Sequence, residues 1–254
     1  MSHQATNGLE QKQAPHPALT EFYRSPADRA RFVGNLFDRA AVDYDWMSGA
    51  MSLGTDRPYR RHALKEAGLE PGMRVLDVAT GTGLLAQAAL ESGIAPEDLI
   101  GLDASRGMLE QNRRQRTLRL VQGIGETLPF RDSTFDFVAL GYALRHVEDL
   151  DALFTEFERV LRKPGRVLIL EISRPASRLG FVLMRFYFQK LLPFLTWSAG
   201  RSPEAPRLLQ YYWATIAECV PPQTILAALS RAGFSSVERR THAGVLSEYL
   251  ALKK

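Results

Sequence analysis

The chain has little cysteine and no long apolar run. Cys219 is the single cysteine in 254 residues, which excludes an intramolecular disulfide and a cysteine-based metal site and suits a reducing cytoplasm. The longest apolar stretch, residues 179–199, is broken by two charged residues and Pro193, so it is a poor membrane span. It can still lie on a membrane surface or cover an apolar ligand. Residues 1–20 are polar and lack the apolar core of a signal sequence, and we expect a disordered tail there.

Neither sign of charge dominates. The net charge is +4 and the pI about 9.3, and the basic residues are spread out except for a cluster at 113–119. A solvated helix face explains that cluster better than a nucleic-acid site does, so we expect no nucleic-acid partner. No group of histidines, cysteines and acids has metal-ligand spacing, and we expect no bound metal. The length and a hydrophobic content of 45% allow one domain with a large core.

Strand and helix patterns alternate from residue 72 onward. Residues 21–68 are expected to be helical, apart from a turn-rich aromatic segment at 44–54. Strands are expected at 73–78, 98–103, 118–122, 134–140, 165–172, 234–240 and 245–252, and helices at 83–92, 105–116, 149–162, 178–195 and 222–232. This alternation predicts an α/β fold with a doubly wound, mostly parallel seven-stranded sheet. The last two strands are close enough to form a hairpin, which makes the final strand antiparallel.

We expect a single domain over residues 21–254. Its parts are a helical lid (21–70), a ligand-binding core (71–177), an inserted helical cover (178–220), and a C-terminal helix and hairpin (221–254). The lid and the cover are both expected over the carboxyl ends of the strands, where ligands bind in open α/β sheets.

The run from Val75 to Gly83 has the layout of a nucleotide-type ligand site. An apolar strand ends in Asp77, a turn with Gly81 and Gly83 follows, and Asp103 ends the next strand, where an acid can take ribose hydroxyls. NAD, S-adenosylmethionine and a purely structural turn are the alternatives. A carboxylate at position 77 repels a pyrophosphate but suits a cationic ligand, and the chain lacks a Tyr-x-x-x-Lys pair. These features favour S-adenosylmethionine.

Several short motifs together resemble class I S-adenosylmethionine-dependent methyltransferases, with a Rossmann-like fold, and specifically the UbiE-type ubiquinone/menaquinone biosynthesis C-methyltransferases. The resemblance spans roughly residues 32–254 and is carried by segments 37–54, 76–83, 103–109, 126–136, 144–147, 159–165 and 232–234. The tyrosine segment that begins at Tyr44 and the run Leu144-Arg145-His146-Val147 are its most specific parts.

The resemblance implies a set of cofactor-binding positions. Around the methionine part and under it they are Asp77, Gly81, Thr82, Gly83 and Gly141; around the ribose and adenine they are Asp103, Ala104, Ser105, Met108, Ile124 and Gly125. The family usually has Asn-Ala where this chain has Ile124-Gly125, so one side-chain hydrogen bond to adenine is expected to be absent.

The resemblance also implies a catalytic pair after the fourth strand. Arg145 is expected to stabilise a phenolate oxygen, and His146 to move a proton. The family typically has Asn in place of His146. The structural alternative is that Arg145 pairs with Glu148 or Asp149 while His146 caps the next helix.

Further substrate-side positions come from the lid and the cover. Tyr44 is the third catalytic candidate, and its structural alternative is packing beside Trp46. The implied substrate-binding residues are Tyr44, Arg57, Arg60, Tyr142 and Tyr211. Aromatic substitutions beside Tyr211 indicate a remodelled acceptor pocket.

The function that the resemblance implies is methylation of a ring carbon of a quinone or phenol precursor. The alternatives are O- or N-methylation of another aromatic molecule, other quinone chemistry with the same cofactor, and a non-catalytic S-adenosylmethionine-binding subunit of a biosynthetic complex. The expected partner is a small aromatic or quinol substrate. A prenyl tail on it, a homodimer and contact with the inner face of a membrane stay open beside the expected cytoplasmic location.

Overall fold

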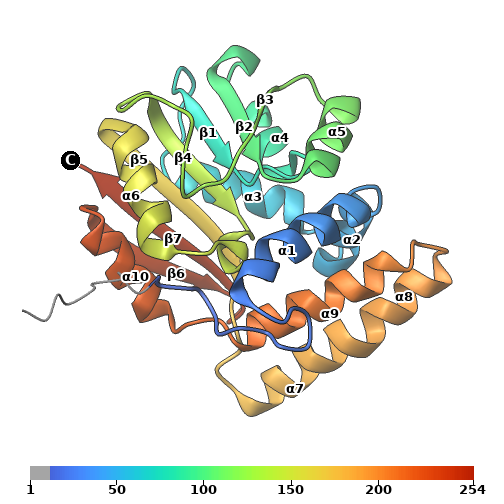
Figure 1. Ribbon diagram of the computed structural model, residues 1–254. Coiled ribbons are helices and arrows are strands. Elements are labelled where there is room, and N and C mark those ends of the chain that lie inside the picture. Colours follow the sequence, from blue (N-terminus) through green and yellow to red (C-terminus); the bar gives the residue numbers. More distant parts are fainter. Residues whose placement is uncertain (1–11) are drawn as a thin grey trace, which may run out of the picture.

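A seven-stranded sheet forms the centre of the molecule in the computed structural model, which describes residues 12–254 (Figure 1). Its strands are β1 (Val75–Val78), β2 (Leu99–Asp103), β3 (Arg119–Gln122), β4 (Phe135–Gly141), β5 (Leu161–Ile172), β6 (Ser235–His242) and β7 (Leu246–Lys253). They lie in the order β3-β2-β1-β4-β5-β7-β6. Only β7 runs against its neighbours, β5 and β6. The predicted doubly wound sheet with an antiparallel last strand is confirmed.

Helices cover both faces of the sheet and build an additional layer beside it (Figure 1). They are α1 (Pro26–Ala40), α2 (Tyr44–Ser52), α3 (Asp56–Glu66), α4 (Leu84–Glu91), α5 (Arg106–Gln115), α6 (Leu150–Val160), α7 (Arg178–Phe186), α8 (Leu192–Ser198), α9 (Glu204–Ala217) and α10 (Pro222–Arg231). A π-helical turn, Tyr187–Leu191, joins α7 to α8. Among the described residues no helix is long and apolar enough to cross a membrane.

The segment at 44–54 is a helix and not the turn-rich stretch expected from its glycines and serines. Buried Met47 anchors α2 to the molecule, and Asp45 accepts a hydrogen bond from Thr82. The helix ends where Leu53 adopts a left-handed conformation and Gly54 N donates to Gly49 O. Tertiary contacts therefore override the weak helix propensity of this segment.

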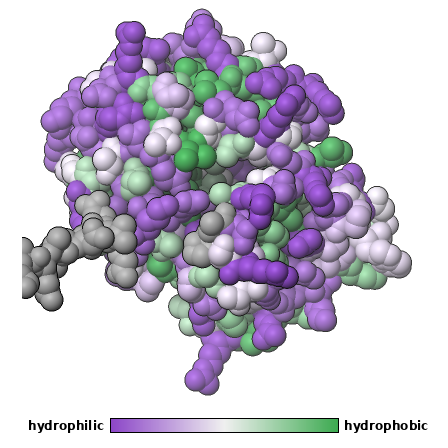
Figure 2. All heavy atoms as spheres, in the orientation of Figure 1, coloured by the Kyte–Doolittle hydropathy of each residue, from purple (hydrophilic) through white to green (hydrophobic). Residues whose placement is uncertain are grey.

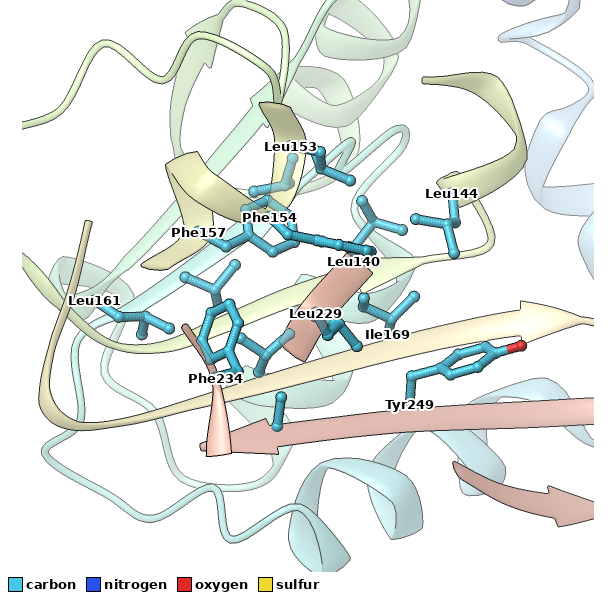
Figure 3. Close-up of a cluster of buried hydrophobic side chains, with 14 of the residues drawn as sticks. Leu140, Leu144, Leu153, Phe154, Phe157, Leu161, Ile169, Leu229, Phe234 and Tyr249 are labelled. Atoms are coloured by element: carbon cyan, nitrogen blue, oxygen red, sulfur yellow. The ribbon is translucent and has the colours of Figure 1, made fainter. Parts of the chain in front are cut away.

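The two faces of the sheet carry separate cores because parallel strands are buried on both sides. On one face, side chains of β4 and β5 pack against α6 and α10. Figure 3 shows this cluster, with Leu140, Ile169 and Tyr249 from strands and Leu153, Phe154, Phe157 and Leu229 from helices. On the other face, side chains of β1 and β4 pack against α3 and α4.

The expected disordered tail, residues 1–20, needs correction in its second half. Residues 1–11 lie outside the described part of the chain. Residues 12–20 pack on the domain: Leu150 N donates to Gln13 O at 2.9 Å, and Val220 N donates to Pro15 O at 2.8 Å. His16 and Leu19 are buried. Satisfied backbone groups and buried side chains hold this segment although its sequence is polar.

Candidate functional site

A cavity of about 410 Å³ opens at the carboxyl ends of the central strands. Five groups of residues line it: Lys12 ahead of α1, α1 and the start of α2, the ends of β1 and β2 with the loops that follow them, the segment 123–127, and the chain from β4 into α6. Most of this lining is apolar. A smaller pocket of about 20 Å³ adjoins it, sharing Tyr44, Ala79, Gly81 and Gly141, and adding Arg60, Asp77, Thr80 and Thr82.

The glycine loop between β1 and α4 forms one wall of both pockets. Ala79, Gly81 and Gly83 all have positive φ, at 53°, 56° and 92°. A Cβ on Gly83 would lie 2.7 Å from Nδ2 of Asn112, which itself donates to Gly81 O at 3.2 Å. Gly83 therefore serves the turn and its packing, because it lines neither pocket.

Asp77 lies at the end of β1 and is 1% exposed. Its Oδ2 accepts a hydrogen bond from Thr80 Oγ1 at 2.7 Å, whereas its Oδ1 has no partner among residues 12–254. Burial raises the pKa of Asp77 to about 7. A buried carboxylate with an unpartnered oxygen at a pocket wall suits a cationic group, such as an ammonium.

Asp103 ends the neighbouring strand, β2, and lines the main cavity. Gly81 N donates to its Oδ2 at 2.7 Å and Ser105 N donates to its Oδ1 at 2.8 Å. Burial raises the pKa of Asp103 to about 6. Two backbone donors fix the carboxylate, and its remaining lone pairs can accept hydrogen bonds from a pair of hydroxyls.

The next part of the lining is apolar. Ala104, Met108, Ile124 and Gly125 contribute to it. A Cβ on Gly125 would lie 2.4 Å from Cδ1 of Leu153, so the close approach of that leucine explains glycine at this position. Such a slot accepts an aromatic base.

Ser105 and Thr82 hold neighbouring elements together. The Ser105 hydroxyl caps α5 by accepting from Met108 N at 3.1 Å, and it donates to Asp38 of α1. Thr82 donates to Asp45 of α2. Both side chains therefore fasten the lid to the core beside the pockets.

His146 lines the cavity in the 3₁₀ turn after β4. The rings of Tyr211 and Tyr212 stack on it at 5.4 Å and 5.7 Å, and Phe37 meets its edge at 5.1 Å. Neither ring nitrogen has a hydrogen-bond partner among the described residues. Burial, and then the charge of Arg145, lower the pKa of His146 well below its ordinary value, so the imidazole is neutral.

Arg145 is not part of the cavity wall, contrary to the expectation that it contacts substrate. It is 1% exposed, and its guanidinium pairs with Glu171 of β5 at 2.8 Å and donates to Thr215 Oγ1 of α9 at 2.6 Å. The anticipated structural partners, Glu148 and Asp149, are also wrong. A charge buried this deeply requires a carboxylate at equal depth, which Glu171 supplies.

Arg29 of α1 is the cationic residue that sequence reasoning missed. It lines the cavity and is 7% exposed. One guanidinium nitrogen donates to Arg145 O at 3.1 Å and contacts His16 Nε2 at 3.1 Å. Its Nε has no partner, and within residues 12–254 no carboxylate lies within 4.0 Å of it. Arg29, Val33 and Phe37, spaced by four, share one helix face, which was the available signal.

The other predicted substrate residues fall in different places. Tyr44 lines both pockets, and its hydroxyl accepts from Tyr212 OH at 3.3 Å. Tyr142 lines the cavity, with the Arg60 guanidinium 4.8 Å from its ring centre. Arg60 is buried in an ion pair with Asp56. Two expectations are wrong in position: Tyr211 lies behind His146 outside the lining, and Arg57 is exposed and pairs with Glu91.

The described residues hold no group of three histidine, cysteine or acidic side chains able to bind a metal ion. Among the polar residues at the two pockets, Asp77 lines the smaller pocket, and Asp103, Arg29 and His146 line the main cavity.

Comparison with known proteins finds that the sequence of this chain is similar to methyltransferases. Residues 25–253 match the ubiE/COQ5 methyltransferase family. Demethylmenaquinone methyltransferase of Symbiobacterium thermophilum is 38% identical over 191 residues, covering 70% of this chain and 74% of that one. The ubiquinone/menaquinone biosynthesis C-methyltransferase UbiE of Xanthomonas oryzae is 34% identical over 216 residues, covering 82% and 84%.

Solved structures agree on the fold. A methyltransferase of Thermotoga maritima described as a possible histamine N-methyltransferase has a TM-score of 0.60 at 18% identity, covering 87% of this chain and 99% of that one. A putative methyltransferase of Haloferax volcanii, solved with its Trm112 activator, has a TM-score of 0.61 at 18% identity, covering 85% and 96%.

Proposed function

Because the chain belongs to the ubiE/COQ5 methyltransferase family, we propose that it transfers the methyl group of S-adenosylmethionine to a ring carbon of a quinol. Relatives that are 38% and 34% identical to this chain are named demethylmenaquinone methyltransferase and UbiE. The observation that carries the proposal is the pair of adjoining pockets, which contain the buried carboxylates of Asp77 and Asp103 and, beside a neutral imidazole, the buried guanidinium of Arg29 without a carboxylate partner.

The two carboxylates and the apolar wall fit S-adenosylmethionine. When bound, this cofactor supplies a methyl group on a positively charged sulfur. Asp77 would accept its ammonium, Asp103 its two ribose hydroxyls, and the apolar wall at Ile124 and Gly125 its adenine. NAD is disfavoured because its pyrophosphate would approach the unpartnered oxygen of Asp77.

Arg29 and His146 fit a ring hydroxyl. A ring carbon becomes nucleophilic when the adjacent hydroxyl ionises, and Arg29 can stabilise the resulting phenolate without giving up its own charge. His146 is neutral and has no partner, and its lowered pKa makes it a weak base. It can accept a hydrogen bond from the ring hydroxyl, and it takes the proton only as Arg29 stabilises the phenolate. With S-adenosylmethionine bound, the new carbon–carbon bond would form as the carbon–sulfur bond breaks. The hydrogen on the methylated carbon would then leave as a proton to solvent, and His146 would return its proton to the ring oxygen as the ring regains its aromaticity.

Arg29 also favours carbon over oxygen as the methylated atom. An oxygen held by a guanidinium is less nucleophilic, whereas the adjacent carbon keeps the electron density of the ring. The apolar lining excludes water from the transferable methyl group.

We further propose that the reaction takes place in the cytoplasm, since the single cysteine suits a reducing compartment. A prenyl tail on the quinol and a homodimer are open features of this proposal.

Two measurements test the proposal. Titration calorimetry is expected to give micromolar binding of S-adenosylmethionine and of its demethylated product, and no binding of NAD. Incubation with S-adenosylmethionine and a reduced demethylated naphthoquinol is expected to give a methylated product by mass spectrometry. Binding without any transfer would contradict the proposal and favour a non-catalytic subunit.

A further inference from the structure

One continuous helical stretch, residues 178–198, lies on the outside of the molecule. It comprises α7, the π turn and α8, and Figure 1 shows α9 between this stretch and α1. Its inner face is packed. The Phe181 ring lies 5.0 Å from the Trp213 ring of α9, Tyr187 OH donates to Ala50 O at 3.0 Å, and Phe188 is buried.

The outer face of the same stretch is also apolar, although it has no partner in the described structure. Seven large hydrophobic side chains, no two neighbours in the series more than five residues apart, are between 39% and 74% exposed. They are Leu179, Val182, Leu183, Phe186, Leu191, Phe194 and Trp197, and we call them the α7–α8 stripe. A helix that is apolar on both faces is ordinarily buried on both, and a contiguous exposed apolar patch marks an interaction site.

The charges around the stripe have one sign. From residue 174 to residue 203 the chain contains no acidic residue and five basic ones, Arg174, Arg178, Arg185, Lys190 and Arg201. Arg201 approaches Asp43, and Arg174 lies over the Phe181 ring. Within residues 12–254, Arg178, Arg185 and Lys190 form no ion pair. The stripe is therefore bordered by free positive charge.

We propose that the α7–α8 stripe rests on the surface of a membrane that contains anionic lipids. Exposed leucine, phenylalanine and tryptophan with arginine and lysine beside them form the pattern of an interfacial helix, which lies in the plane of the membrane. A second copy of this chain is disfavoured, because two such stripes face to face would bring together positive charges with no acidic residue in the segment to pair them.

Figure 2 shows pale atoms with some green ones at the right edge, where Figure 1 places α8, and further green atoms in the upper part and the centre of the same face. The proposal concerns this outer surface alone and does not depend on the reaction proposed for the cavity.

Flotation of the full chain with lipid vesicles tests the proposal. We expect binding to phosphatidylcholine vesicles that contain phosphatidylglycerol, and weaker binding to phosphatidylcholine alone. Trp197 is 74% exposed whereas Trp213 is 5% exposed. Vesicle binding is therefore expected to shift the tryptophan emission to shorter wavelength, and the shift is expected to be absent in Trp197→Phe.

Two double variants separate the apolar and the electrostatic contributions to vesicle binding. Phe194→Ser with Trp197→Ser removes apolar contact at exposed positions, and Arg185→Glu with Lys190→Glu reverses charge beside the stripe. Each pair is expected to weaken vesicle binding by at least about tenfold. The control is Arg113→Glu with Arg114→Glu on α5, which changes the net charge equally at exposed positions away from the stripe and is expected to bind as wild type.

Three results would overturn the proposal. They are absence of binding to anionic vesicles, equal weakening by the α5 control pair, and a stable dimer in sedimentation velocity that the Phe194 and Trp197 variant separates into monomers. Activity on a water-soluble quinol is expected to be unchanged in all of these variants, so failure here is distinguishable from failure of the proposed reaction.

Discussion

Asp77 illustrates how a buried carboxylate with an unpartnered oxygen weakens the protein that contains it. Its carboxylate is buried, has one unpartnered oxygen, and has a pKa raised to about 7. A pKa that folding raises means that stability is lost as the pH rises through the range from the ordinary value to the shifted one, here from about 4 to about 7. A bound cation would remove this penalty.

Replacing Asp77 with Asn is therefore expected to have opposite effects on stability and on binding. At pH 8 the free variant gains up to about 4 kcal/mol of unfolding free energy, from a shift of about three pKa units at 1.36 kcal/mol each. Its affinity for S-adenosylmethionine falls at least about tenfold, because the ion pair with the ammonium is lost. Denaturant unfolding and titration calorimetry measure the two effects.

The pH dependence of binding is the second test of the same residue. In the wild type, affinity for S-adenosylmethionine is expected to fall by up to about tenfold for each pH unit below about 7, because a proton must then leave Asp77. In Asp77→Asn the decline begins near the pKa of Asp103, about 6. Identical pH profiles for the two proteins would contradict the assignment of Asp77 to the ammonium.

Substitution of Arg29 by Gln is expected to lower kcat, whereas substitution of Arg145 by Gln is expected to lower stability. Arg29→Gln lowers kcat by about 10²- to 10³-fold, as for loss of one donor to a developing oxyanion, with cofactor affinity unchanged. Arg145→Gln leaves Glu171 buried without a counter-charge and costs about 3–5 kcal/mol of stability. Steady-state kinetics and chemical denaturation distinguish the two outcomes.

Each of these two arginine substitutions has a control variant. Arg29→Lys keeps the charge and is expected to recover part of kcat. Arg145→Met combined with Glu171→Leu removes both buried charges and is expected to recover most of the lost stability. An Arg29→Gln variant with unchanged kcat would contradict the proposed contact with the ring oxygen.

At the scale of elements, the segment ahead of α1 acts as part of the domain. Leu19 is 6% exposed and belongs to the cluster of α1 and α9 side chains that includes Tyr211. Leu19→Ala is expected to cost about 2–4 kcal/mol of unfolding free energy. Thr20→Ala, at an exposed neighbour, is the control and is expected to change stability by less than about 0.5 kcal/mol. Equal stability of the two variants would contradict this prediction and indicate that the segment does not pack on the domain.

Elements with strong periodicity were predictable from sequence, and elements held by tertiary contacts were not. The strands up to Ile172 and the final hairpin follow from apolar runs between Gly and Pro signals. Helix α2 was missed because Gly49 and its serines have low helix propensity, and its anchors, buried Met47 and the Asp45–Thr82 contact, are invisible in sequence.

The same division holds for the site. Asp77, Gly81 and Asp103 could be located because the glycine loop and the acids that end β1 and β2 are local patterns. The roles of Arg29 and Arg145 could not be assigned, since each depends on which side chain faces the cavity and which finds a distant carboxylate. Glu171 is 26 residues from Arg145, and no spacing rule connects them.

At the scale of the whole molecule, the sheet and the helical layers contribute different residues to the cavity. The core supplies Asp103 and His146 to the cavity, α1 and α2 supply Arg29 and Tyr44, and α7 and α8 form the outermost helical layer (Figure 1). Helix α9 packs against both α1 and α8, and Tyr187 of the outer layer also donates to Ala50 O of α2, so the lid and the outer layer are joined directly and through α9. We expect the protein to unfold as one unit, which coincident fluorescence and circular dichroism transitions would verify.

The most direct test of the account uses a reduced demethylated naphthoquinol that carries deuterium at the ring position to be methylated. Mass spectrometry of the product after reaction with S-adenosylmethionine follows both the methyl group and the label. Methylation at carbon displaces the deuterium, and the account predicts a methylated product without it. A methylated product that retains the deuterium would mean transfer to oxygen, and it would contradict the role assigned to Arg29 in the cavity.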